Sequence, residues 1–189
     1  GEEIAELDDR LSVSELGFVQ QNPDNQIVTD KVWHELAFGL ESLGLDNASI
    51  KRRVAEMASF FDIQGWFRKN VTELSGGQKQ LLNLASVMVM QPKVLILDEP
   101  TAQLDPIAAS EFMRTLYRIN RELGTTVIIS EHRLEELFPM ADRVIVMEAG
   151  RIAYCGRPED VGISLAEDSN PMFYGLPAVM KIYAQTGAG

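Results

Sequence analysis

The apolar run Val94–Leu97 is followed directly by two acidic residues, Asp98 and Glu99. Continuous apolar runs of this length are typical of strands that are buried on both faces of a parallel sheet. A second apolar run, Thr125–Ser130, follows after a segment of helix length. Because a strand, a helix and a strand in succession form a right-handed crossover, we expect an α/β fold with a mostly parallel sheet flanked by helices.

Helical patterns dominate residues 30–90. Asp30–Leu43 and Ser49–Phe61 carry apolar residues at helical spacing, and Ser75 opens a third helix that runs to about Met90. The stretch is expected to form a helical lobe inserted into the α/β domain.

The two ends of the chain have weaker patterns. Residues 1–20 are expected to form a hairpin-like start followed by a strand. Val144–Met147 and Ile152–Tyr154 read as two more strands joined by a tight turn. Residues 162–175 are polar and irregular, which favours a linker, and a short helix is expected from Pro177 to Ala184.

Charge and composition exclude some classes of function. The chain has 17 Lys and Arg against 28 Asp and Glu, a formal net charge of -11 at pH 7. A nucleic-acid partner is not expected, because such partners require basic residues that neutralise phosphates. The single cysteine, Cys155, cannot form an internal disulfide, and there is no cysteine cluster for zinc.

The segment Leu74-Ser75-Gly76-Gly77-Gln78 stands at a predicted helix start. The first turn of a helix presents free N–H groups and the positive end of the helix dipole, and glycines allow an anion to approach the backbone. The Ser75 hydroxyl can cap the helix and donate to a phosphate. Taken alone, the Ser-Gly-Gly segment is better explained by an ordinary serine cap with glycines from a loop.

Asp98 and Glu99 stand at the carboxyl end of a predicted central strand, where α/β sheets bind ligands. Asp98 can hold a magnesium ion, and Glu99 can orient an attacking water or accept its proton. The alternative for this pair alone is a helix cap and a surface acid.

Two further polar residues follow predicted strands. His132 can hydrogen-bond a terminal phosphate oxygen, and Gln21 can ligate magnesium or position water. Alone, His132 is better explained as a histidine that is satisfied at a strand end, and Gln21 alone indicates no function.

The order and spacing of these features closely resemble the ATP-binding cassette (ABC) ATPase family. The resemblance covers roughly residues 1–160. It identifies the matching segments as the Q-loop glutamine Gln21, the signature Leu74–Gln78, Walker B with the catalytic glutamate at Val94–Glu99, the D-loop Thr101–Asp105 and the switch histidine His132.

Family membership implies a P-loop NTPase-like fold, ATP and Mg²⁺ as cofactors, and a role for each residue. Catalytic roles fall to Glu99, His132 and Gln21, and metal binding to Asp98 and Gln21. The segment Ser75, Gly76, Gly77 and Gln78 would bind the ATP of a second ABC ATPase domain. Asp105 would couple the two sites of the dimer.

A narrower resemblance points to the ATPase subunits of energy-coupling factor (ECF) transporters, which power uptake of vitamins or of cobalt and nickel ions. It rests on Gln21–Val28, Ala37–Glu41 and Tyr174–Met180. It implies a transmembrane subunit as partner and a peripheral position on the cytoplasmic face of the membrane. The segment Ser130–Glu136 is similar to members in which two such domains are fused.

One family element is missing from the sequence, the phosphate-binding loop Gly-x-x-x-x-Gly-Lys-[Ser/Thr], or Walker A. Gly1–Arg10 resembles the stretch that follows this loop, so the loop is expected to precede Gly1. On this interpretation residues 1–161 are an ABC ATPase domain fragment with its helical lobe at about 30–90, and residues 162–189 are a linker and the start of a C-terminal extension. The fragment alone is expected to be inactive and to expose apolar sheet surface.

Three alternatives remain open from the sequence. One is an ATPase of DNA repair or chromosome organisation, but residues 30–74 are too short for the coiled coils that such proteins insert. Another is a soluble ABC ATPase that acts on ribosomes. The third is a non-catalytic interaction fragment.

Overall fold

The computed structural model describes residues 15–186. The chain divides into two compact units, residues 1–131 and residues 132–189. The hairpin-like start expected from the sequence lies outside the described residues, apart from its strand.

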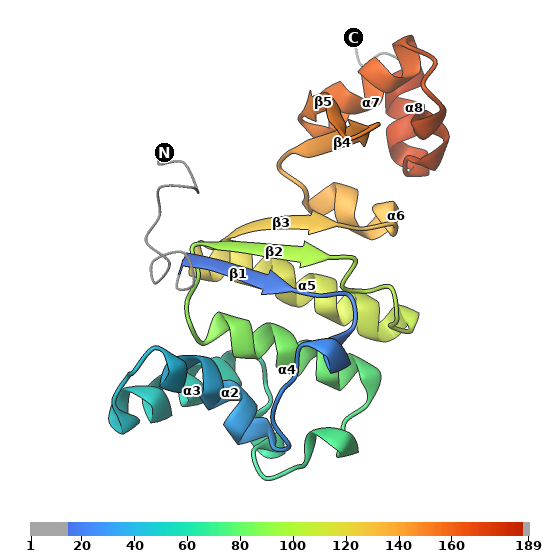
Figure 1. Ribbon diagram of the computed structural model, residues 1–189. Coiled ribbons are helices and arrows are strands. Elements are labelled where there is room, and N and C mark those ends of the chain that lie inside the picture. Colours follow the sequence, from blue (N-terminus) through green and yellow to red (C-terminus); the bar gives the residue numbers. More distant parts are fainter. Residues whose placement is uncertain (1–14, 187–189) are drawn as a thin grey trace. The chain divides into compact units, whose positions relative to one another are not determined.

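The first unit is built on a three-stranded parallel sheet (Figure 1). Its strands are β1 (Leu16–Val19), β2 (Val94–Asp98) and β3 (Thr126–Ser130), and β2 lies between the other two. Asp98 stands directly opposite Ser130 in the pairing of β2 with β3. The parallel sheet predicted from the apolar runs is therefore confirmed, and all three strands end at the same edge.

The helices of the first unit are α2 (Val32–Ser42), α3 (Asn47–Phe60), α4 (Gly76–Met88) and α5 (Pro106–Leu123), with short 3-10 turns at Pro23–Asn25, Gln64–Trp66 and Val71–Glu73. Helices α4 and α5 lie on the same side of the sheet, and α2 and α3 pack beyond α4 (Figure 1). The helical lobe predicted at about residues 30–90 thus comprises α2, α3 and α4.

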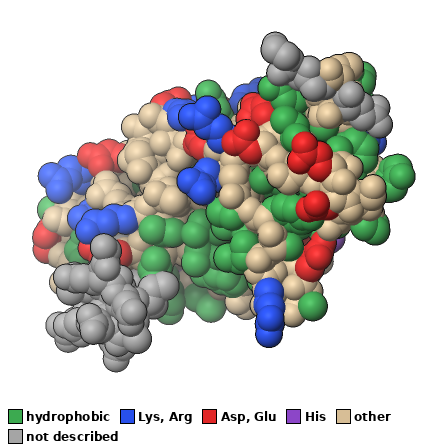
Figure 2. All heavy atoms as spheres, turned by 90° about the horizontal axis from the view of Figure 1, so that it is seen from above, with side chains coloured by type: hydrophobic (Ala, Val, Ile, Leu, Met, Phe, Trp, Pro, Cys, Tyr) green, Lys and Arg blue, Asp and Glu red, His purple; other side chains and the backbone are tan. Residues whose placement is uncertain are grey.

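The strands are not buried on both faces. This corrects the prediction from their apolar runs and agrees with the expectation that the chain exposes apolar sheet surface. Phe18 of β1 is 47% exposed and Ile128 of β3 is 51% exposed. Ile96, which pairs with both, is only partly buried. Within residues 15–131 the helices cover one face of the sheet, so these side chains have no layer to pack against. Exposed hydrophobic side chains are also evident on the face of the molecule drawn in Figure 2.

The second unit contains α6 (Leu134–Leu137), the antiparallel strands β4 (Val144–Glu148) and β5 (Arg151–Gly156), α7 (Pro158–Glu167) and α8 (Ala178–Thr186), with 3-10 turns at Phe138–Met140 and Pro171–Gly175. The tight turn between the strands has positive φ at both Ala149 and Gly150, the geometry that suits a two-residue hairpin.

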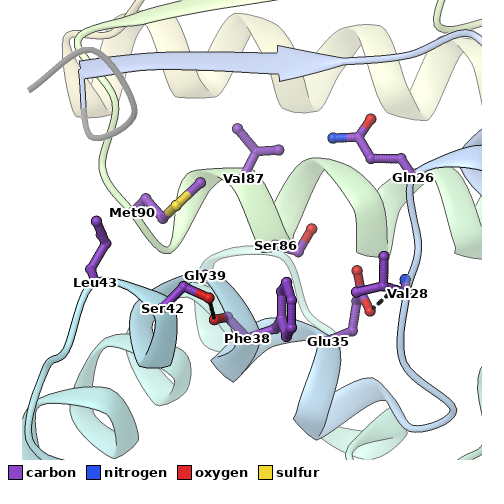
Figure 3. A pocket seen from close by; sticks show the side chains of 10 residues that line it. All are labelled: Gln26, Val28, Glu35, Phe38, Gly39, Ser42, Leu43, Ser86, Val87 and Met90. Carbon is purple, nitrogen blue, oxygen red and sulfur yellow. Dashed lines mark hydrogen bonds between the residues drawn. The ribbon is translucent and has the colours of Figure 1, made fainter. Parts of the chain in front are cut away.

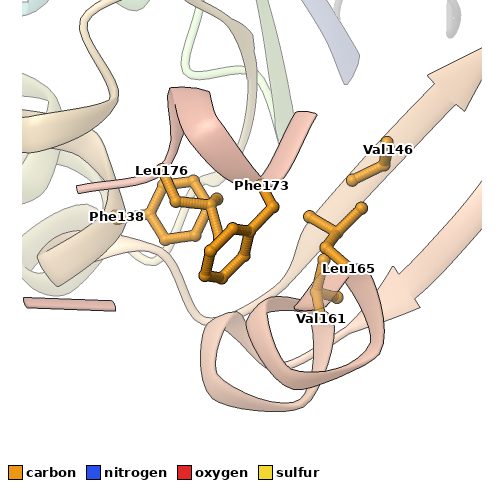
Figure 4. Packing of buried hydrophobic residues seen from close by; sticks show 6 residues of the cluster. All are labelled: Phe138, Val146, Val161, Leu165, Phe173 and Leu176. Carbon is orange, nitrogen blue, oxygen red and sulfur yellow. The ribbon is translucent and has the colours of Figure 1, made fainter. Parts of the chain in front are cut away.

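A small core holds the second unit together. It consists of Phe138, Val146, Val161, Leu165, Phe173 and Leu176 (Figure 4). Val161 and Leu165 belong to α7, so the linker expected from residue 162 is wrong for residues 162–167, which complete this helix. Val161 and Leu165 are about one helical turn apart, so both side chains lie on the same face of α7, and burial of that face stabilises the helix.

None of the helices in residues 15–186 combines the length and hydropathy of a transmembrane span.

Candidate functional site

Gln21 and Glu99 meet at the edge where β1 and β2 end. The Gln21 Nε2 donates a hydrogen bond to Glu99 Oε2 over 3.2 Å, although 78 positions separate the residues in the chain. Gln21 is exposed and Glu99 is half-buried, so the pair is open to solvent. Glu99 has a φ of 41°, an uncommon value for a non-glycine residue and one that is concentrated at functional sites.

Ser130, at the end of β3, organises the two acidic residues. Its Oγ donates to Asp98 Oδ1 over 2.8 Å. The Glu99 backbone N–H donates to the carbonyl oxygen of Ser130 over 3.1 Å and lies 3.2 Å from its Oγ. The Ser130 contacts therefore fix the backbone turn that sends Asp98 and Glu99 in different directions.

The helix that begins at Ser75 has the reciprocal cap of a capping box. The Gln78 N–H donates to Ser75 Oγ over 3.3 Å, and the Ser75 N–H donates to Gln78 Oε1 over 3.0 Å. The predicted helix start is confirmed. The cap also satisfies two of the N–H groups that the first turn would otherwise leave free.

The two glycines of this turn differ in their surroundings. A Cβ added at Gly77 would lie 3.0 Å from the Cβ of Ala108 on α5, whereas one added at Gly76 would meet no described atom within 4 Å. Packing against α5 therefore accounts for glycine at position 77. Nothing in the described part of the chain requires glycine at position 76, where the backbone is open to a ligand or a partner.

Asp105 is the N-cap of α5. Its Oδ1 accepts hydrogen bonds from the N–H groups of Ile107 and Ala108, both over 3.0 Å. Pro106 follows at the first helical position, as the sequence predicts. These capping contacts are enough to explain an aspartate at position 105, even if no second protein domain contacts it. Its role in dimer coupling stays a prediction.

His132 is exposed and stands two residues after the end of β3, at the start of the second unit. The first unit by itself thus brings together Gln21, Asp98 and Glu99. The contact of His132 with phosphate stays a prediction.

Asp98 and Gln21 supply carboxylate and amide oxygens, the ligand type that Mg²⁺ prefers. No group of three or more His, Cys, Asp or Glu side chains that could enclose a metal is found among the described residues. This donor set fits magnesium better than a structural metal, because Mg²⁺ usually binds through one or two protein carboxylates together with waters and substrate phosphates.

Sequence reasoning missed a buried amide at this edge, Gln80 of α4. Its Nε2 donates to the carbonyl oxygens of Gln20 and Pro100, both over 3.1 Å. The signal was available in the sequence, because Gln80 occupies a position on the same helix face as Leu84 and Val87, which are buried. Ser130 was missed as well, although it ends an apolar strand in the same way as Asp98.

The first unit has a parallel sheet with two adjacent acidic residues at the end of its central strand, and a helix that starts with Ser-Gly-Gly. These features define an α/β fold of the ABC ATPase class. Residues 1–102 match the family model described as ABC transporter, and the chain belongs to this family.

Relatives and a solved structure agree with this assignment. The chain is 55% identical over 98% of its length to an ABC transporter ATP-binding protein of Bacillus thuringiensis subsp. konkukian. It is 45% identical over 79% of its length to an ABC transporter ATP-binding protein of Pyrococcus horikoshii. The structure of CbiO1 from Clostridium perfringens, described as part of the ABC transporter complex CbiONQ, matches 89% of the chain with a TM-score of 0.74 and 37% identity.

The chain spans only part of these proteins. It covers 33% of the Bacillus relative, 54% of the Pyrococcus relative and 67% of the CbiO1 chain.

Proposed function

We propose that this chain is part of an ATP-binding and ATP-hydrolysing subunit that powers an ECF-type membrane importer. The observation that carries the proposal is the hydrogen bond between Gln21 and Glu99 beside the carboxyl end of the central strand. The likeness to CbiO1, which is described as part of a transporter complex, supports the ECF assignment.

In the proposed reaction the oxygen of a water molecule attacks the γ-phosphorus of ATP, the bond from this phosphorus to the β–γ bridging oxygen breaks, and ADP leaves. Glu99 orients the water or takes its proton, and Gln21 holds the Glu99 carboxylate by donating to its Oε2. The Ser130 contacts keep the Glu99 backbone in place, so that little reorganisation is required when the water is bound. His132 would hydrogen-bond the γ-phosphate.

Asp98 and Gln21 would hold the magnesium ion, which neutralises charge on the β- and γ-phosphates when it is bound. The Ser130 hydroxyl donates a hydrogen bond to Asp98 Oδ1, and this contact orients the carboxylate. Gln21 donates to Glu99 through its amide nitrogen, which leaves its amide oxygen as the atom suited to a metal.

Ser75, Gly76, Gly77 and Gln78 would bind the ATP held by a second ABC ATPase domain, in the same or another chain. The exposed start of α4 suits this role, because backbone N–H groups and the helix dipole both favour phosphate. Asp105 would couple the two sites from the neighbouring start of α5.

Gly76→Ala tests the proposed contact with the second domain. In the full-length protein we expect ATP hydrolysis to fall about 10–100-fold, because an added methyl group displaces the approaching phosphate. The fold should be unaffected, since the position has open space and alanine favours a helix more than glycine does. The matched control is Gly65→Ala, which also meets no described atom within 4 Å. Equal hydrolysis by the two variants would contradict the proposed contact.

The 189-residue chain alone should hydrolyse ATP negligibly, because its sequence contains no Walker A motif to grip the phosphates. Phosphate release by the purified chain is the measurement, with the full-length protein as positive control. Turnover by the chain that disappears in the Glu99→Gln variant would overturn this expectation.

A groove of about 510 Å³ between α2 and α4 is the proposed docking site for the transmembrane subunit. Phe38, Leu43, Val87 and Met90 supply apolar side chains, and Gln26 and Glu35 line the polar end (Figure 3). Glu35 also accepts hydrogen bonds from the N–H groups of Val28 and Thr29, so the groove is tied to the segment that follows Gln21. A partner seated here would be linked to the proposed catalytic pair.

Purification of the full-length protein from solubilised membranes tests the whole proposal. We expect a membrane subunit to co-purify and magnesium-dependent ATP hydrolysis to be present, as for a peripheral protein on the cytoplasmic face. Nucleic acid is not an expected partner of a domain with a net charge of -11. Recovery with ribosomes and without a membrane subunit would favour a non-transport ABC ATPase instead.

A further inference from the structure

Gln80 connects the backbones on both sides of the proposed catalytic pair. Its side chain is 0% exposed, and its single amide nitrogen donates to the carbonyl oxygens of Gln20 and Pro100. Gln20 directly precedes Gln21, and Pro100 directly follows Glu99. One buried side chain thus bridges the two loops that carry the pair.

We infer that Gln80 is a positioning residue that sets the spacing of Gln21 and Glu99. The inference rests on the proposed function of that pair. A primary amide nitrogen has two N–H donors, and here both are directed at backbone carbonyls, so the bridge uses the full donor capacity of the group. The amide oxygen cannot replace the nitrogen, because both partners are acceptors.

The bridge also connects the pair to the signature. Gln80 lies two residues after Gln78 on α4, whose first turn carries the segment proposed to bind the second domain's ATP. Since a helix moves as a rigid element, displacement of its first turn is transmitted to Gln80. The spacing of Gln21 and Glu99 therefore responds to occupancy of the signature.

Packing alone does not explain a glutamine at position 80. Its Oε1 is buried without a hydrogen-bond partner in the described structure, and a buried polar atom of this kind costs free energy. A methionine would fill nearly the same volume without that cost. The two bonds made by the Nε2 are what a hydrophobic residue could not supply.

Thr125, the residue before β3, provides a control. It is 4% exposed, and its Oγ1 donates to the carbonyl oxygen of Pro92 over 3.2 Å. Thr125 and Pro92 precede the paired strands β3 and β2, so their contact lies at the opposite edge of the sheet from Gln21 and Glu99. Loss of this hydroxyl should therefore affect stability without changing the spacing of the pair.

The test compares Gln80→Met and Thr125→Val in the full-length protein, with kcat and KM for ATP measured well below the unfolding midpoint. For Gln80→Met we expect kcat to fall about 10–100-fold and KM to change little, since misplacement of a catalytic group by about 1 Å can cost this much. For Thr125→Val we expect kcat to stay near wild type. Equal kcat values for the two variants would overturn the inference. If Gln80→Met is insoluble, Gln80→Asn replaces it, because its amide is one carbon too short to bridge both carbonyls.

A double variant separates positioning from general disturbance. If Gln80 acts through the pair, adding Gln80→Met to Gln21→Ala should lower kcat by a much smaller factor than adding it to the wild type, because only Glu99 is left to misplace. Fully multiplied losses would overturn the inference. Glu99→Gln, measured in parallel, tests the proposed function itself. Wild-type ATP hydrolysis by Glu99→Gln would contradict the proposed function. A large loss in Glu99→Gln together with wild-type kcat in Gln80→Met would contradict only the role of Gln80.

Discussion

Replacement of Glu99 by glutamine in the full-length protein is expected to lower kcat for ATP hydrolysis by about 10²–10⁴-fold, with little change in KM. Glutamine has nearly the same shape and retains an oxygen that can accept the Gln21 hydrogen bond. It cannot take a proton from water. Because the contacts of Glu99 with Ser130 are made by the backbone N–H, they are retained in the variant.

Steady-state phosphate release measures this effect, and binding of a fluorescent ATP analogue checks that nucleotide affinity is preserved. The matched control is Glu111→Gln, an exposed glutamate on α5 in the same unit. It removes the same charge at a position outside the cluster formed by Gln21, Asp98 and Glu99. A Glu99→Gln variant that hydrolyses ATP as fast as the control would eliminate the assignment of Glu99 as the catalytic base.

Helix starts were predictable from the sequence because their chemistry is local. The serine cap at Ser75 and the aspartate cap at Asp105 each act on N–H groups two or three residues away. The parallel order of the strands was predictable for a related reason, since each crossover between them is long enough to contain helices.

The partners of Ser130 and Gln80 were not predictable in this way. Their hydrogen bonds join residues that are 20 to 60 positions apart in the chain, and they depend on strand register and on how α4 packs against the sheet. Ser130 contacts Asp98 because the two residues are paired across β2 and β3. A one-residue slip in that register would turn Ser130 to the opposite face.

The open face of the sheet shows a second limit of sequence patterns. The apolar runs of β2 and β3 indicate burial on both sides, yet Ile128 of β3 is about half exposed and Ile96 of β2 is only partly buried. The exposure agrees instead with the expectation that the chain exposes apolar sheet surface. An apolar pattern indicates that a surface favours burial, but the pattern does not identify which segment covers that surface. In contrast, the interpretation of residues 162–175 as polar and irregular missed most of α7 and the core contribution of Leu165.

Stability of the helical lobe should depend most on the fully buried residues of α2. Leu36→Ala is expected to reduce the local free energy of unfolding by about 2–5 kcal/mol, because it removes a fully buried side chain and leaves a cavity. Leu36 is 0% exposed. Hydrogen exchange of peptides that cover α2 and α3 in the full-length protein measures the loss where it occurs.

Phe38→Ala is the matched comparison, two residues away on the same helix and 49% exposed. Its aromatic ring lines the groove between α2 and α4, so its loss should lower lobe protection much less than Leu36→Ala does. Binding of the membrane subunit should show the opposite ranking at temperatures where both variants are folded. This reversal separates the two surfaces of α2: one stabilises the lobe, and the other is available to a partner. Equal protection in the two variants would contradict the division.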